Sequence, residues 1–155
     1  MLWLLLSHPQ QFEQLKADPS LVTSVVEESL RYESPTQRST SRFALEDIEI
    51  SGFEVKKGQQ FAAILGSANR DEDYFENADK FLVSRRKNRH IAFGLGAHNC
   101  LGKNLARLEA KIVLEELLRS CVSISLIDSA PIWRKNSFFR GISSIRGQIH
   151  LAKTD

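Results

Sequence analysis

The sequence predicts an α+β chain that is mainly helical and carries small β-sheets. Apolar residues recur at helical spacing over residues 18–34 and 101–120, and they alternate with polar residues only in short runs within 43–65 and 123–151. With 155 residues, 42% of them apolar, the chain is long enough to bury one core. Its net charge of +2 argues against disorder and against general nucleic-acid binding.

The amino-terminal segment predicts two helical pieces that are interrupted near His8 and Pro9. Residues 3–6 resemble the end of a buried helix. The apolar opening over residues 1–6 is far shorter than the roughly 20 residues that span a bilayer. It also lacks a preceding basic stretch, so we expect no signal peptide, no membrane anchor and a cytoplasmic location. Cys100 and Cys121 form no C-x-x-C pair, and we expect both thiols to be free.

A helix start is predicted at Asp18 and Pro19, because aspartate is a good N-cap and proline is favoured in the first turn. Pro35 ends this helix, since the residue before a proline avoids the helical region. Its apolar stripe contains Leu21, Val22, Val25, Val26, Ser29 and Leu30.

Residues 43–65 predict a β-meander, with apolar runs at 48–50, 53–55 and 61–65 separated by turns. Residues 69–90 lack periodicity, but their aromatic residues Tyr74, Phe75 and Phe81 favour an ordered, packed loop. A long helix follows over about residues 101–120. One of its sides carries Leu101, Leu105, Leu108 and Ile112. The tail predicts short strands, with a turn at residues 137–139.

The stretch FGLGAHNCLG, residues 93–102, bears most directly on chemistry. Gly94 and Gly96 allow a tight, partly left-handed loop, and Cys100 lies where that loop enters the helix. Backbone N–H groups and the helix dipole stabilise an anionic sulfur there. Gly102, in the first helical turn, leaves room for a flat ligand. Most free cysteines are small buried apolar residues, but this pattern suits a thiolate ligand to haem iron.

FGLGAHNCLG resembles the cysteine-ligand loop of the cytochrome P-450 superfamily, haem-thiolate monooxygenases of the bacterial soluble type. Glu28-Ser-Leu-Arg31 resembles the family's Glu-x-x-Arg helix. Three further segments resemble, in order, the stretch after that helix, the meander before the loop and the helix after it: RYESPTQRSTSRFALEDIEISG, NRDEDYFENADKF and LARLEAKIVLEELLR. The resemblance implies that residues 1–155 form the carboxy-terminal, cysteine-ligand portion of a P-450 fold, without its amino-terminal half and central distal helix.

The resemblance implies roles around haem b, iron protoporphyrin IX. Cys100 would be the proximal metal ligand and catalytic residue, Phe93 would shield its sulfur, and His98 and Arg42 would hold the propionates. Further cofactor contacts would come from Gly94, Leu101, Gly102 and Ala106. Substrate-pocket candidates are Thr36, Ser39, Thr40 and Phe138. From the residues alone, His98 also reads as an exposed loop histidine and Arg42 as a surface strand charge.

Glu28 and Arg31 would form a buried ion pair that joins the meander to the helix, whereas an exposed pair would contribute only about 0.2–0.5 kcal/mol. The meander departs from the family at Ala78-Asp79-Lys80-Phe81, where Pro-Glu-Arg-Phe or a variant is usual. Lysine lacks the bidentate fork of arginine, so the resemblance assigns no third member to this ion network.

The implied reaction inserts one oxygen atom of O₂ into a small organic substrate, with electrons from a ferredoxin-type donor. Lys103 and Arg107 would either meet that donor or form a solvated helix face. Without a distal half, we expect this chain alone to bind haem weakly and to turn over poorly. The apolar faces of residues 3–6 and 101–118 would then be exposed. Two alternatives remain: a non-catalytic or vestigial haem-binding module that needs a complementing chain, and an unrelated α+β interaction domain.

Overall fold

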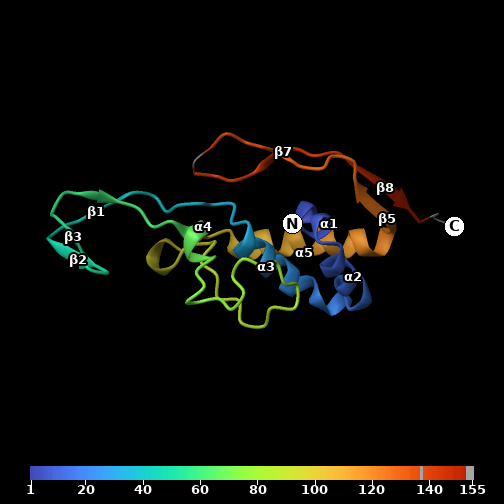
Figure 1. Ribbon diagram of the computed structural model, residues 1–155, viewed down its shortest axis with the longest axis horizontal. Coiled ribbons are helices and arrows are strands. Elements are labelled where there is room, and N and C mark those ends of the chain that lie inside the picture. The colour runs from blue at the N-terminus through green and yellow to red at the C-terminus, as the bar shows by residue number, and fades with distance from the viewer. Residues whose placement is uncertain (137, 153–155) are drawn as a thin grey trace.

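The computed structural model describes residues 1–136 and 138–152, in which short strand pairs extend from a helical body (Figure 1). The helices are α1 (Leu2–Ser7), α2 (Pro9–Ala17), α3 (Val22–Tyr32), α4 (Leu65–Ala68) and α5 (Lys103–Ser120), with 3₁₀ turns η1 (Pro19–Leu21) and η2 (Gly96–His98). The strands are β1 (Arg42–Phe43), β2 (Ile48–Ile50), β3 (Phe53–Val55), β4 (Gln60–Phe61), β5 (Cys121–Leu126), β6 (Ile132–Trp133), β7 (Ile142–Ser144) and β8 (Gly147–Leu151). The predicted α+β class is confirmed.

The hydrophobic core lies where α1, α2, α3 and α5 meet the loop that follows α4. It consists of Leu4, Leu5, Leu15, Val22, Val25, Phe81, Val83 and Leu114. Leu4 and Leu5 are 1% and 0% exposed, so the expectation of an exposed face over residues 3–6 is wrong for these two. The chain breaks between α1 and α2 at His8, as predicted, because Pro9 begins the second helix.

The helix start at Asp18 is present, but its first turn is tighter than predicted. The Asp18 carboxylate accepts hydrogen bonds from the backbone N–H and hydroxyl of Ser20. Pro19 opens the 3₁₀ turn η1, and the α-helix proper begins at Val22. The buried side of α3 contains four residues of the predicted stripe, together with two charged residues: Val22, Val25, Val26, Ser29, Glu28 and Arg31.

The expected three-stranded meander is wrong, since its third run does not join the first two. Strands β2 and β3 form a hairpin whose turn residues, Ser51 and Gly52, both have positive φ, as a two-residue hairpin turn requires. The chain then returns to Ala44, which exchanges backbone hydrogen bonds with Gln59 and Gly58. Strand β4 therefore pairs with β1 rather than with β3.

Residues 69–95 contain no regular helix or strand and pack as an ordered loop. Phe75 and Phe81 are each 3% exposed, as predicted. Tyr74 is 62% exposed, so the expectation of burial is wrong for this ring, which meets only the edge of Phe75.

The carboxy-terminal strands pair as β5 with β8 and β6 with β7. Trp133 of β6 meets Trp3 of α1 edge-on, with ring centroids 5.5 Å apart. Arg140, after this hairpin's turn, lies over Trp133 and pairs with Glu33 at the end of α3. The predicted turn at residues 137–139 includes Ser137, which lies outside the described residues. Among the described residues, no helix has the length and apolar character needed to cross a membrane.

Candidate functional site

Most of the predicted site residues line one cavity of about 690 Å³ between α3, β1, β4, the loop before α5 and the turn after β6. They are Thr36, Ser39, Thr40, Arg42, Phe93, Gly94, His98, Cys100 and Phe138. Apolar side chains such as Phe61, Ile91 and Phe139 form much of the remaining wall. The residues that line this cavity include no aspartate or glutamate.

The loop that carries Cys100 folds back on itself. Gly94 and Gly96 have φ values of +71° and +73°, a region that only glycine enters easily. The Cys100 N–H donates to the carbonyl of Phe93 at 2.9 Å, and the Asn99 side chain donates to the carbonyl of Gly94 at 2.8 Å. Cys100 is a free, exposed thiol at the cavity wall.

Three predicted cofactor contacts are not brought to this cavity. Helix α5 begins at Lys103 with Gly102 as its N-cap, so Gly102 does not lie in the first helical turn as expected. A Cβ at Gly102 would meet nothing within 4 Å. Leu101 and Ala106 are exposed, and neither lines the cavity.

Three basic side chains, Arg38, Arg42 and His98, line the cavity. His98 is exposed in η2, and Arg42 of β1 donates to the Thr40 hydroxyl at 2.9 Å. Arg38, which the sequence did not single out, also lines the cavity and lies 5.8 Å from the centroid of Phe138. A soft sulfur, apolar walls and basic groups without an acidic neighbour together fit an iron porphyrin that carries two carboxylates.

The ion pair of Glu28 and Arg31 is completely buried beneath this site. Two hydrogen bonds of 2.8 Å join the guanidinium to both carboxylate oxygens. The remaining Arg31 donors bind three backbone carbonyls of the following loop, those of Asn69, Ala78 and Lys80. The pair thereby fixes residues 69–82 against α3.

Arg85 is the third member of this ion network, the role for which the Lys80 side chain lacks a bidentate guanidinium. Its Nε donates to Glu28 at 2.9 Å, and its other nitrogens bind three loop carbonyls. The role of Arg85 was not predicted from the sequence, because the family pattern points to position 80. The signal was an arginine within the basic run at 85–89, just after the buried Phe81 and Val83. Asn69 was also missed; it is fully buried and bonds to both Ser34 and the backbone of Ile91.

Glu27, Arg107 and His90 form a second polar cluster next to the cysteine loop. Glu27 accepts two hydrogen bonds from Arg107, at 2.6 and 2.9 Å, and lies 3.1 Å from Nε2 of His90. Partial burial raises the pKa of Glu27, but hydrogen bonds from His90 and Arg107 outweigh it and lower that pKa to about 2. Arg107 is therefore ion-paired, and its side chain is 35% exposed. Lys103 forms no ion pair within the described part of the chain.

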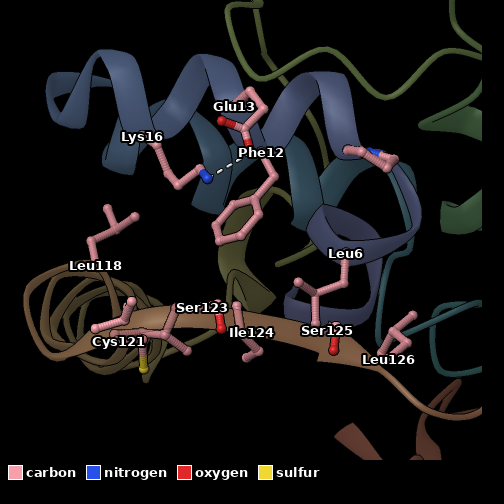
Figure 2. Close-up of a pocket in the computed structure, with 13 residues that line it drawn as sticks. Leu6, Phe12, Glu13, Lys16, Leu118, Cys121, Ser123, Ile124, Ser125 and Leu126 are labelled. Carbon is pink, nitrogen blue, oxygen red and sulfur yellow. Dashed lines mark ion pairs between the residues drawn. The ribbon is translucent and has the colours of Figure 1, made fainter. Parts of the chain in front are cut away.

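A separate cavity of about 410 Å³ lies between α1, α2, the end of α5 and β5 (Figure 2). Its walls are mainly apolar, and the Phe12 ring projects into it. An ion pair between Glu13 and Lys16 closes one side at 2.6 Å. Cys121 lines this cavity and lies just beyond the opposite end of α5 from Cys100. Figure 2 shows its sulfur directed away from Phe12. This second cavity offers no convergent set of reactive groups.

Comparison with known proteins agrees with these observations. The family model for cytochrome P-450 matches residues 9–143. The biotin biosynthesis cytochrome P-450 of Bacillus subtilis (strain 168) is 47% identical over 141 residues, which cover 91% of this chain and 35% of that protein. The cytochrome P-450 monooxygenase PikC of Streptomyces venezuelae is 37% identical over 147 residues, which cover 93% of this chain and 35% of that protein.

Solved structures are similar to the whole described fold. The structure of P-450BioI with an acyl carrier protein ligated to hexadec-9Z-enoic acid has a TM-score of 0.91 at 43% identity, over 96% of this chain and 38% of that one. CYP109E1 from Bacillus megaterium in complex with corticosterone has a TM-score of 0.88 at 37% identity, over 94% and 39%. The chain thus spans little more than a third of the length of these relatives.

Proposed function

Because this chain belongs to the cytochrome P-450 family, we propose that it binds haem b through Cys100 as part of a monooxygenase. The proposed reaction inserts one oxygen atom of O₂ into a small organic substrate. The observation that carries the proposal is the exposed thiol of Cys100 on the wall of a largely apolar cavity that Arg38, Arg42 and His98 also line.

Cys100 would supply the proximal thiolate. Its backbone N–H is already held by the Phe93 carbonyl, so the loop presents the sulfur without rearrangement. Haem iron with a thiolate ligand supplies oxygen activation, since the sulfur pushes electron density towards the metal and favours O–O cleavage. Phe93 would limit access of water to that sulfur.

Arg42 and His98 would hold the two propionates. Arginine binds a carboxylate through two parallel hydrogen bonds, and within residues 1–136 and 138–152 the Arg42 guanidinium hydrogen-bonds only to the neutral hydroxyl of Thr40. Thr36, Ser39, Thr40 and Phe138 share the cavity and would face the substrate. Relatives have been solved with ligands as different as an acyl chain on a carrier protein and a steroid.

Lys103 is the residue we assign to an acidic, ferredoxin-type electron donor. It lies three residues after Cys100, at the start of α5, without a carboxylate partner in the described ranges. Arg107 has its guanidinium committed to Glu27 and is not included.

A second candidate is a non-catalytic haem-binding module completed by another chain. It is favoured by the exposed apolar side of α5, where Leu105, Leu108 and Ile112 are all more than half exposed, and by the exposed Leu101 just before this helix. Under this reading, haem uptake persists while the chain alone fails to oxidise substrate. We expect weak haem binding and poor turnover from the isolated chain in either case, because the thiol is open to water.

Haem titration of three proteins tests the proposal: the unchanged chain, Cys100→Ser and Cys121→Ser. The two substitutions are chemically identical, and only Cys100→Ser removes a thiol from the cavity of about 690 Å³ that Arg42 and His98 line. We expect the unchanged chain and Cys121→Ser to give the same ferric Soret band of thiolate ligation, and Cys100→Ser to lose it. A spectrum that is insensitive to Cys100→Ser would overturn the proposal. Because binding is weak, we expect the reduced carbon monoxide complex to lack a strong thiolate band.

A further inference from the structure

We propose that Glu27 is a positioning residue for the cysteine loop. Acting through Arg107 and His90, it fixes the Phe93 ring and the Phe93 carbonyl that binds the Cys100 N–H. We call Glu27, His90, Phe93 and Arg107 the Phe93 cluster. Its effect on haem rests on the proposed function, whereas its effect on the loop does not.

The first step is the contact between α3 and α5. Both nitrogens of the Arg107 fork meet both oxygens of Glu27, at 2.6 and 2.9 Å. Such bidentate, charge-assisted pairs hold one geometry more strictly than a single hydrogen bond. Because Arg107 lies two turns beyond Cys100 on α5, the pair sets the position of the helix that follows the sulfur.

The second step is the contact with the aromatic ring. The guanidinium carbon of Arg107 lies 4.7 Å from the centroid of Phe93, within the range of a cation–π interaction. The His90 ring lies 6.2 Å from Phe93 at an angle of 48°. The same imidazole accepts from the Ala92 N–H at Nδ1 and faces Glu27 with Nε2. Glu27 thereby orients both groups that touch the ring.

The third step reaches the sulfur-bearing residue. The Phe93 carbonyl accepts the Cys100 N–H at 2.9 Å, so a displacement of Phe93 moves the backbone of Cys100. Glu27 also offsets the positive charge of Arg107 beside the loop. Removing the carboxylate leaves an uncompensated cation there and frees its side chain to leave the ring.

Two neighbouring glutamates of α3 thus have separate tasks. Successive residues of a helix point about 100° apart. The side chain of Glu28 turns to the buried loop, whereas that of Glu27 turns to α5 and the cysteine loop. Glu28 fixes the loop that follows α4 against α3, and Glu27 positions the loop that carries Cys100.

Amide hydrogen exchange of the haem-free chain tests the positioning role directly. The variants are Glu27→Gln and Arg107→Leu. The matched control is Arg119→Leu, which breaks a bidentate glutamate–arginine pair with Glu116 near the other end of the same helix. We expect the Cys100 amide to exchange at least about tenfold faster in the first two variants, because a charge-assisted contact opposed its opening. The control should leave it unchanged.

The exchange of a core amide separates positioning from general stability. The amide of Val25, a fully buried residue of α3, should be accelerated clearly less than the amide of Cys100 in the Glu27→Gln and Arg107→Leu variants. A merely structural role would accelerate Val25 and Cys100 by the same factor, and that result overturns the inference. The double variant Glu27→Gln with Arg107→Leu should show less than the sum of the two single effects, since both changes remove the Glu27–Arg107 pair.

Haem titration then tests whether Glu27 also affects cofactor binding. We expect Glu27→Gln to lower haem affinity about tenfold, the effect typical of a lost supporting contact behind a metal ligand, and to shift the reduction potential. Haem affinity and potential equal to those of the unchanged chain would overturn this part. If the unchanged chain shows no thiolate spectrum, the proposed function fails, while the exchange result still decides the role of Glu27.

Discussion

Glu28 shows how a single charged residue is accommodated in the interior. It is fully buried, and its two oxygens accept hydrogen bonds from Arg31, Leu82, Arg85 and Asn88. A buried charge with this many donors is stable only while its partners stay in place. The Glu28 side chain therefore requires loop residues far away in the sequence to keep their hydrogen-bond donors in place.

Arg31→Met should destabilise the chain by about 3–5 kcal/mol, because it removes the bidentate partner of Glu28 and the donor to the carbonyls of Asn69 and Ala78. Urea unfolding followed by circular dichroism measures the loss. Arg119→Met, which breaks the exposed pair with Glu116, serves as the control and should leave the unfolding midpoint unchanged. Equal effects of the two substitutions would contradict the assigned importance of burial.

The contribution of Glu27 should depend on pH in a defined direction. Its folded-state pKa is lowered from 4.5 to about 2, so the folded protein holds the proton less readily than the unfolded chain. The stabilisation is complete above pH 4.5 and is lost as the pH falls towards 2. Urea unfolding of the unchanged chain and Glu27→Gln should therefore differ at pH 7 and converge within that window. A difference that persists at pH 2 would contradict the assignment.

Single residues were predictable from the sequence where a local motif carried them. Cys100, the loop glycines and the pair of Glu28 with Arg31 follow from short patterns. Arg85 and Asn69 could not be found in this way, because each acts across a loop whose path no periodicity describes. The partners of Glu27 lie 63 and 80 residues away, beyond the reach of any local pattern.

At the scale of elements, helix boundaries follow from capping chemistry. Asp18→Ala should destabilise the chain by about 0.5–2 kcal/mol, since it removes the acceptor for the Ser20 N–H in the first turn of η1. Asp18→Asn keeps an oxygen acceptor and should recover most of the loss. Thermal unfolding of the three proteins measures both. An equal loss in the two variants would indicate that charge, rather than capping, is responsible.

Strand pairing was less predictable than helix formation. Short apolar runs indicate strands, but they do not state which run pairs with which. Here the return of residues 56–59 to Ala44 decides the partner of β4. The helical stripe of α3, in contrast, was buried largely as its periodicity predicts, because one side of a regular helix must face the core.

At the scale of the whole molecule, α5 separates two environments. Leu114 is fully buried in the core, whereas Leu105 and Ile112 are 60% and 54% exposed. Such a row of apolar side chains on a surface promotes association. Apolar periodicity predicted the side that carries Leu105 and Ile112, but it does not tell which side of the helix meets the core.

Replacing Leu105 and Ile112 together by lysine should reduce self-association without loss of stability. Both side chains are more than half exposed, so the free energy of unfolding should change by no more than about 0.5 kcal/mol for each. Light scattering over a concentration series measures the first effect, and urea unfolding measures the second. Leu114→Ala on the opposite side should instead cost about 2–5 kcal/mol. Unchanged scattering would contradict the role of the exposed row.

Both tryptophans of the chain meet at one point, where Trp3 of α1 touches Trp133 of β6. The intrinsic fluorescence of the protein therefore originates almost entirely from this junction, away from Cys100. An emission change during heating would signal departure of the carboxy-terminal strands from the first helix, and it would say little about the sulfur. The molecule thus carries a built-in optical probe whose signal is separate from any absorbance change at the cysteine loop.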